Sequence, residues 1–571
     1  MLLHLCLIAI RRRLGAQRSA VRMTRLTPFL IMLSCVAASV RAQTTRRIEP
    51  HSADSVFVEL QDGEYVKLSL AHHTGLAASV LRPDGSTLRP AVELEGEDDI
   101  EFVAEGAGRY AVVVRNDSGA ATQYDIVSRE RLSLDERTAP ALWRDPVPSP
   151  RIEALRRQID SGNTNTARFW SAVANEGTPL IEPLDARYDL VTFLWRAAHD
   201  TRNVYLRATF GVPDGPHDAF HQLGNTDVWY LTLPIPKGAR FLYRLQPNRA
   251  SDRGMSPVTA QFDPLNRGPR QNCPGDTTSY LCQSLGELPE ATPQPWLERR
   301  AGVATGRIER HAIHSALQNV DRDLTVYLPA GYASKGKPCP LLVLFDGDDY
   351  LDPSWSGLNT WDNLIAAGRI PPTVVVMVHN LPHRRLFDLI ANATFGDFLA
   401  KELVPWARTR YNVSRAASRT VVGGASAGGF AATYLGLAHP EVFGNVLSMS
   451  GAFWWSPEHN GGICGGACPK PGDAPPVTNR DAMTEPNWIA QLALRRPASR
   501  VRFYFAVGAF EFDQSGTGAG ILEETRHLRD ILRAKGSQVI YQQFVAGHDG
   551  LGWRGALADG LLNLLGARDE P

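Results

Sequence analysis

The chain has 571 residues, the length of three or four typical domains, and its 43% hydrophobic and 21% charged residues exclude wholesale disorder. Its 49 glycines and 39 prolines exclude a collagen or low-complexity chain and indicate many turns. Lys+Arg and Asp+Glu number 60 each, so no overall basicity points to a nucleic acid partner.

The first 42 residues have the composition of an export signal. They carry seven arginines and no acid, and without them 53 basic and 60 acidic residues leave a net charge of −7. Arg25 opens a basic region, residues 26–36 form a short apolar core, and Val40-Arg41-Ala42 resembles a cleavage site. The apolar run is too short to span a bilayer. We therefore predict a periplasmic or secreted protein with no stable membrane insertion after cleavage.

Two points about this signal stay open. Residues 1–22 precede a second methionine, Met23, and either belong to the translated chain or mark a start assigned too far upstream. Met32-Leu-Ser-Cys35 would permit a lipid anchor in place of soluble export.

Residues 43–135 show the alternation of short β-strands. Strand-like runs are separated by turn signals such as Asp62-Gly63 and Pro83-Asp84-Gly85. The expected strands are 56–60, 65–70, 100–104 and 110–114. They predict a β-sandwich accessory domain, and residues 108–114 resemble the late strands of pre-peptidase C-terminal-type domains.

A linker at 136–164 separates this region from a second β domain. The linker is rich in proline at first and has a helical pattern at 152–159. That domain spans 165–300, and its last fifty residues are loop-like. Its expected strands are 190–195, 204–210, 228–233 and 241–245.

From residue 301 to 571 strands alternate with helices, which predicts an α/β domain with a mostly parallel sheet. Helical patterns include 395–411 and 521–535. The expected strands are 324–328, 341–345, 373–378, 420–422, 446–449, 501–507 and 539–545.

A G-x-S-x-G motif centred on Ser426 lies between the strand at 420–422 and a helical segment. A tight strand–turn–helix requires small residues beside the serine and exposes its hydroxyl at the N-terminus of the helix. Partial positive charge there favours an oxyanion. The context therefore predicts a nucleophilic serine rather than a plain glycine-rich turn.

A serine hydroxyl needs a base, and in this fold the partners follow in the order acid, then histidine. His548 follows the strand at 539–545 and is the predicted general base. Glu511, after the strand at 501–507, is the predicted acid, with Asp513 as the alternative. The predicted oxyanion donors are the backbone N–H groups of Ala427 and Asp348.

Five cysteines remain after signal removal. Cys273 with Cys282 and Cys464 with Cys468 are close enough in sequence to form local disulfides in an oxidising compartment, which leaves Cys339 free. A zinc site shared by the two pairs is the alternative, but no histidine stands at finger spacing, so we expect no metal.

Several segments resemble the enterochelin (ferric enterobactin) esterase family of α/β-hydrolases. Residues 424–455, from the serine motif to Phe453-Trp454-Trp455, match it in kind, and residues 547–554 resemble its histidine loop. Within 165–300, Glu176-Gly-Thr-Pro179 and Asn225-Thr-Asp-Val-Trp229 resemble its N-terminal domain. The predicted fold class is thus α/β: an α/β-hydrolase catalytic domain preceded by two β-sandwich-like domains.

The resemblance implies cofactor-free hydrolysis of a small-molecule ester, a catecholate siderophore trilactone with or without iron. Arg385, Asp388 and Asn392 resemble the family's R-x-x-E-L-x-x-N segment, with Asp388 where glutamate is usual, and become candidate substrate-binding residues. Trp454 and Trp455 would offer flat faces to catechol rings, unless they pack in the core.

Two other functions stay open. An exported feruloyl or acetyl esterase would use the same fold and the same three residues, because fold does not decide substrate. A non-enzymatic binding protein would have its β domains as the working part, and the complete set of serine, acid and histidine argues against it.

Overall fold

The computed structural model describes most of the chain after the predicted signal peptide. The described residues are 44–72, 76–94, 97–133, 149–210, 218–248, 259–271, 273, 282–456, 487–512 and 520–566. The signal peptide, Cys464, Cys468 and the alternative acid Asp513 lie outside them. In these described stretches no helix is long and apolar enough to cross a membrane.

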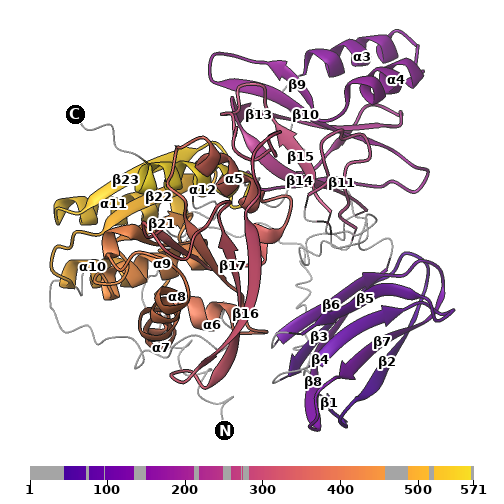
Figure 1. Cartoon of the computed structure of the whole chain (residues 1–571). Coiled ribbons are helices and arrows are strands. Elements are labelled where there is room, and N and C mark those ends of the chain that lie inside the picture. The colour runs from indigo at the N-terminus through magenta and orange to yellow at the C-terminus, as the bar shows by residue number, and fades with distance from the viewer. Residues whose placement is uncertain are drawn as a thin grey trace, which may run out of the picture. The chain divides into compact units, whose positions relative to one another are not determined.

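The first described region is a sandwich of two four-stranded antiparallel sheets, with strand orders β1-β8-β3-β6 and β2-β7-β4-β5 (Figure 1). Apolar side chains fill the space between the two sheets, and Leu70, Phe102 and Val112 are fully buried there. The strands are β1 (Thr44–Ile48), β2 (Ser52–Leu60), β3 (Tyr65–His72), β4 (Leu76–Leu81), β5 (Thr87–Glu93), β6 (Glu97–Val103), β7 (Gly108–Asn116) and β8 (Thr122–Leu132).

The second β domain has sheets of order β12-β13-β10-β9 and β11-β14-β15. Helix α3 (Pro150–Asp160), which falls within the predicted linker, begins at the N-cap Ser149 and buries Ile152 and Leu155 against α4 (Ala167–Glu176) and β10. The strands are β9 (Leu180–Pro183), β10 (Tyr188–Arg196), β11 (Val204–Ala208), β12 (His221–Gln222), β13 (Val228–Pro236), β14 (Arg240–Pro247) and β15 (Ser284–Glu287).

The third region is built on one eight-stranded sheet of order β16-β17-β19-β18-β20-β21-β22-β23. In this order, β16 is antiparallel to β17 and β17 is antiparallel to β19. The six strands from β19 through β18 to β23 are parallel, so their carboxyl ends share one edge. The strands are β16 (Arg307–Ser315), β17 (Val320–Leu328), β18 (Leu341–Leu344), β19 (Val374–Val378), β20 (Thr420–Ala425), β21 (Asn445–Met449), β22 (Arg502–Gly508) and β23 (Gln538–Phe544).

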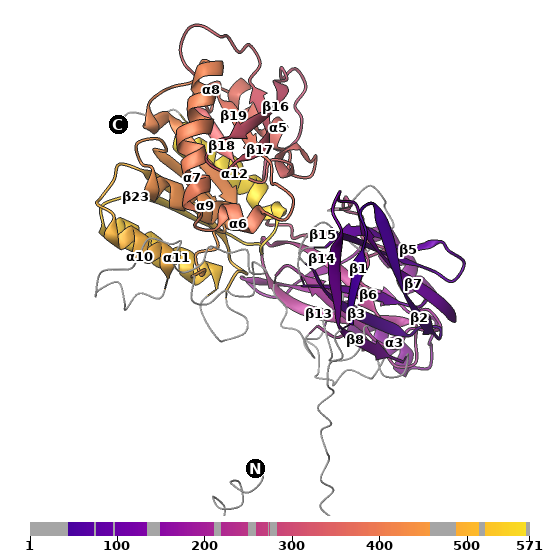
Figure 2. The same cartoon turned by 90° about the horizontal axis from the view of Figure 1, so that it is seen from below.

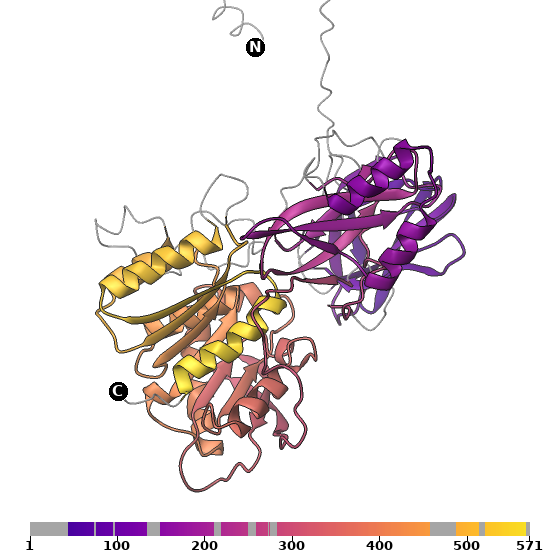
Figure 3. The same cartoon turned by 90° about the horizontal axis from the view of Figure 1, so that it is seen from above.

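Helices cover both faces of this sheet, as in an α/β-hydrolase (Figures 1 and 2). Helices α5 and α12 pack on one face and α7 to α11 on the other, and Figure 3 shows α11 and α12 on either side of β23. The elements are η1 (Asp349–Leu351), α5 (Gly357–Ala366), α6 (Arg385–Leu389), α7 (Ala393–Asp397), η2 (Phe398–Leu403), α8 (Val404–Arg410), η3 (Ala417–Arg419), α9 (Ala427–Ala438), α10 (Trp488–Arg495), α11 (Ile521–Ala534) and α12 (Gly550–Leu565).

Two local features differ from the sequence expectation. The helix expected at 395–411 is three segments, with the π-helical turn η2 in the middle. Pro405, at the start of α8, has no N–H for an i→i−4 bond, which accounts for the irregular turn before it. The edge strand β16 was not expected, because all its inward-facing positions except Ile313 carry polar side chains and it lacks an apolar run.

Candidate active site

Ser426 occupies a sharp turn between β20 and α9. Its φ of 57° and ψ of −120° form a backbone conformation that residues other than glycine rarely adopt. Its backbone N–H donates to the Met449 carbonyl at 2.9 Å. A Cβ on Gly424 would lie 2.8 Å from the Gly428 backbone, so the turn closes only without a side chain there. The glycines of the motif thus hold the serine hydroxyl at the carboxyl edge of the sheet.

His548 lies in the loop between β23 and α12 and joins the serine to an acid. Its Nε2 is 2.9 Å from Ser426 Oγ, and its Nδ1 is 2.7 Å from Glu511 Oε1. The second Glu511 oxygen accepts the Gly508 N–H at 2.7 Å, and the carboxylate is buried. With its proton on Nδ1, the imidazole would turn an accepting Nε2 toward the serine hydroxyl. The structure therefore brings together all three residues predicted from chain order.

Trp553 braces the imidazole from the first turn of α12. The two rings meet edge to face with centroids 4.8 Å apart, and the indole N–H donates to the buried Ser450 hydroxyl at 2.8 Å. In the sequence, Trp553 stands out only through the resemblance of residues 547–554 to the histidine loop of a known family. Its place five residues after His548, at the start of a helix, was the available signal for this positioning contact.

The predicted oxyanion donors lie at the ends of two neighbouring strands. Ala427 opens α9, and Asp348 follows β18 after a turn in which Gly347 donates its N–H to the Val378 carbonyl at 3.0 Å. The Asp348 side chain points to solvent and pairs with His379 at 2.8 Å. Among the described residues, neither the Ala427 nor the Asp348 backbone N–H has a protein acceptor. Both groups are thus free to bind a substrate oxygen, and their role stays a prediction.

A buried carboxylate beside this turn was not predicted from the sequence. Asp346 has φ of 55°, is 7% exposed, and accepts hydrogen bonds from Arg385 at 2.6 and 2.8 Å and from Asn380 at 2.7 Å. The guanidinium of Arg385 is therefore already paired, although part of it remains exposed. Arg385 stays a candidate ligand for an anion only through its remaining exposed edge.

Three other predicted substrate-binding residues have structural partners instead, which corrects the expectation. Asp388 is 4% exposed and forms an ion pair with the buried Arg322 at 2.8 Å. Asn392 accepts the Phe395 N–H at 3.0 Å and so caps α7. Trp455 is 1% exposed and packs against aromatic rings of α9 and α10. Asp388 and Trp455 are thus buried inside the hydrolase domain, Asn392 is half-buried at the start of α7, and Trp454 keeps a partly exposed ring.

The cysteines divide as follows. Cys273 and Cys282 form a disulfide, whereas Cys339 is a free thiol whose pKa is raised by burial. The other predicted pair lies outside the described residues. Across the described ranges there is no cluster of three or more histidine, cysteine, aspartate or glutamate side chains suited to a metal ion.

Comparison with known proteins finds similarity to esterases. The family model described as "Putative esterase" matches residues 315–564, and the model "Enterochelin esterase, N-terminal" matches residues 190–297. An iron(III) salmochelin esterase of Escherichia coli O6:H1 is 29% identical over 431 residues, which are 72% of this chain and 96% of that protein. An iron(III) enterobactin esterase of Dickeya dadantii is 27% identical over 448 residues, again 72% and 96% of the two chains.

A solved structure shares the fold. The crystal structure of the enterobactin esterase from Shigella flexneri, determined in the presence of 2,3-dihydroxy-N-benzoyl-serine, superposes with a TM-score of 0.51 and 26% sequence identity. The match covers 70% of this chain and 98% of that one. The likeness therefore extends over the second β domain as well as the α/β sheet.

Proposed function

Because the chain belongs to the enterochelin esterase family and is an ester hydrolase, we propose that it cleaves the ester bonds of a catecholate siderophore outside the cytoplasm. The observation that carries the chemistry is the pair of hydrogen-bonding distances from His548, 2.9 Å to Ser426 and 2.7 Å to Glu511. The proposed substrate is a trilactone of the enterobactin type, with or without its iron.

The proposed reaction proceeds in two steps. His548 removes the Ser426 proton as Oγ attacks the ester carbonyl, and Glu511 stabilises the imidazolium that forms. The carbonyl oxygen becomes an oxyanion held by the backbone N–H groups of Ala427 and Asp348. His548 then returns the proton to the leaving alkoxide oxygen, which departs as an alcohol. In the second step His548 takes a proton from a water that attacks the acyl-enzyme, and it passes that proton to Ser426 Oγ as the carboxylic acid is released.

The substrate class is supported by the extent of the family match. The relatives named as iron(III) salmochelin or enterobactin esterases align over 96% of their own length, which includes a part that corresponds to the second β domain. A simple acyl esterase needs only the hydrolase domain, so a match over both domains favours the more specific substrate.

Export is supported by two independent features of the chain. Residues 1–42 have the charge pattern of a signal peptide, and the Cys273–Cys282 disulfide is typical of a protein that folds in an oxidising compartment. N-terminal sequencing of the protein recovered from a periplasmic or culture fraction tests this, and we expect the mature chain to begin at Gln43.

A substrate panel tests the function. We expect kcat/KM for a catecholate trilactone to exceed that for methyl ferulate at least tenfold, which corresponds to ~1.4 kcal/mol of transition-state binding. The Ser426→Ala variant should lose turnover by several orders of magnitude yet still bind the trilactone. A tenfold preference for ferulate would refute the siderophore substrate and leave the esterase standing. A parent protein that no fluorophosphonate probe labels would instead indicate a binding protein.

A further inference from the structure

We propose that the second β domain positions the catalytic histidine, and that Thr209 is the positioning residue that acts on His548 through its neighbours Gly547 and Asp549. This inference rests on the function proposed above. By this inference, the second β domain helps to hold Glu511 and His548 in place.

The first contact is a hydrogen bond between the two domains. Thr209 directly follows β11, and its hydroxyl donates to Asp549 Oδ2, the residue after His548. The same hydroxyl accepts the Leu242 N–H at 3.0 Å, while the Thr209 N–H donates to the Leu242 carbonyl at 2.9 Å. Because the Thr209 oxygen accepts a hydrogen bond from the Leu242 N–H, the hydroxyl proton is available to donate to Asp549.

Asp549 transmits this contact to the start of α12. It is 5% exposed, and its Oδ1 accepts the backbone N–H groups of Leu551 at 2.9 Å and Gly552 at 3.4 Å. Burial raises the pKa of its carboxyl, and the hydrogen bonds from Thr209 and the helix backbone oppose that rise. One buried carboxylate therefore ties the second β domain to the helix that carries Trp553.

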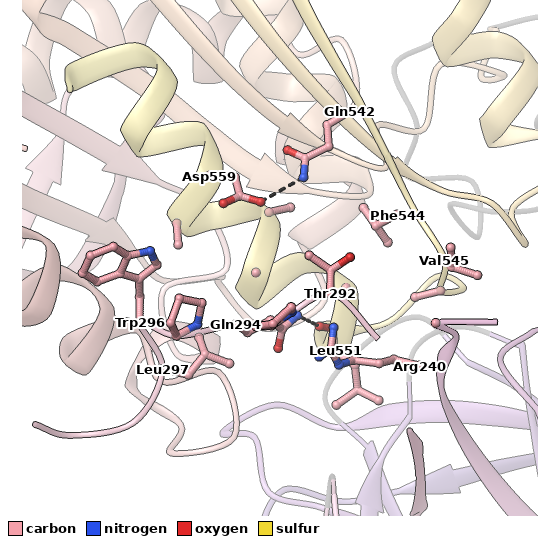
Figure 4. Close-up of a pocket in the computed structure, with 18 of the residues that line it drawn as sticks. Arg240, Thr292, Gln294, Trp296, Leu297, Gln542, Phe544, Val545, Leu551 and Asp559 are labelled. Atoms are coloured by element: carbon pink, nitrogen blue, oxygen red, sulfur yellow. Dashed lines mark hydrogen bonds between the residues drawn. The ribbon is translucent and has the colours of Figure 1, made fainter. Parts of the chain in front are cut away.

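The backbone on the other side of His548 is held by the same domain. Arg240, the first residue of β14, donates its N–H to the Val545 carbonyl at 2.9 Å and forms a parallel bridge with Ala546. A Cβ on Gly547 would lie 1.6 Å from the Thr209 carbonyl oxygen, so the two backbones touch directly. Figure 4 shows Arg240, Val545 and Leu551 in the lining of the adjoining cavity of about 110 Å³.

The loop that carries the acid is held as well. Phe510, the residue before Glu511, is 9% exposed and belongs to the hydrophobic core of the second β domain. Its ring meets Phe210 edge to face with centroids 6.1 Å apart, and Phe210 packs on Phe241 at 4.8 Å. Side chains next to both Glu511 and His548 are thus fixed by residues more than two hundred positions away in the sequence.

His548 itself is 39% exposed on its side chain, so packing around the imidazole cannot hold it alone. A displacement of about 1 Å in a reacting group costs on the order of 10²-fold in rate. Loss of the Thr209 contact should therefore lower kcat and leave substrate binding largely unchanged.

The test compares Thr209→Val with Thr209→Ser on p-nitrophenyl butyrate. We expect Thr209→Val to lower kcat at least 30-fold with KM within twofold of the parent, and Thr209→Ser, which keeps the hydroxyl, to stay within threefold in kcat. Thr232→Val is the matched control, because it removes a buried hydroxyl that pairs with Thr192 at 2.9 Å in the other sheet of the same domain. It should stay within twofold in both constants.

A second variant covers the case in which Thr209→Val does not fold. Phe210→Leu keeps the hydroxyl contact and removes the ring that faces Phe510, and we expect a three- to tenfold loss in kcat with KM unchanged. A folded Thr209→Val protein with parental kcat, or a Phe210→Leu protein with parental kcat, would overturn the proposal. The rate of fluorophosphonate labelling separates the two hypotheses: an unlabelled parent refutes the proposed function, whereas equal labelling of parent and Thr209→Val refutes only the positioning role.

Discussion

Replacing Asp388 with alanine should destabilise the hydrolase domain without weakening substrate binding. Asp388 is 4% and Arg322 1% exposed on their side chains, and the Arg322 Nη2 lies 2.8 Å from Asp388 Oδ2. Its N–H bonds do not point straight at that oxygen, so the contact is an ion pair more than an aligned hydrogen bond. Burial lowers the pKa of Arg322, and the Asp388 charge offsets that effect.

The size of the effect follows from the charge left behind. Removing one partner of a buried ion pair costs about 3–5 kcal/mol. Arg322 would keep its hydrogen bond to Gln318 at 3.0 Å and its place 4.9 Å from the Phe395 ring, so we take the lower end of that range. A loss of about 3 kcal/mol corresponds to a fall of roughly 3–5 °C in the melting temperature of a cooperative unit of about 400 residues, the hydrolase and the second β domain together.

Differential scanning calorimetry of the full chain measures this change, with KM for the ester substrate determined in parallel. The exposed Asp321, whose side chain pairs with His314 at the surface, provides the control, and Asp321→Ala should shift the transition by less than about 1 °C. The double variant Arg322→Met with Asp388→Leu should recover most of the loss, because neither buried charge remains. A transition unmoved by Asp388→Ala, together with a tenfold higher KM, would show that Asp388 faces the ligand and that our reasoning is wrong.

Three further expectations concern the site and the cysteines. Glu511→Gln should lower kcat by about 10³–10⁴-fold, since the amide cannot stabilise the imidazolium, and Asp513→Asn should not; the reverse outcome would make Asp513 the acid. Peptide mapping without reduction should find Cys273 joined to Cys282, Cys464 joined to Cys468 and one alkylatable thiol, Cys339, whereas three alkylatable thiols would refute this pairing. Asp349 lies at the surface of the turn after β18, but desolvation in that turn, and then the charge of Asp346, raise its pKa to about 6. The Asp349 carboxyl is therefore neutral below that pH and charged above it. Repulsion between this charge and an anionic siderophore at ~10 Å amounts to roughly 0.4–0.8 kcal/mol. KM for such a siderophore should therefore be about two- to fourfold lower at pH 5 than at pH 7.5. Asp349→Asn should remove this difference, and a persisting difference would assign it to another group.

The order of strands, helices and reacting residues could be predicted because each of them has a signal in its own short stretch of sequence. The alternation of apolar runs marks β18 to β23, and the serine motif, the acid and the histidine each follow a strand at the same edge of a parallel sheet. Chain order alone therefore indicated that Ser426, Glu511 and His548 would meet.

The orientation of single side chains could not be predicted in the same way. Asp388 pairs with a residue of β17, and Thr209 reaches a residue 340 positions away, and no sequence period reports such partners. The sequence around a tryptophan such as Trp455 does not distinguish a residue that lines a binding site from one that is buried in the core. These assignments depend on tertiary packing, which the pattern of one sequence does not contain.

The shared core around Phe510 and Val545 sets where this chain can be divided. Those hydrolase residues pack with Phe193, Phe241 and other residues of the second β domain, so the two regions should melt in one cooperative transition. The β-sandwich core, by contrast, is made entirely of residues between Ile48 and Ile126. Gene fusion or truncation can therefore treat the sandwich as a removable module, whereas a cut between β15 and β16 would expose aromatic surface on both fragments and invite aggregation.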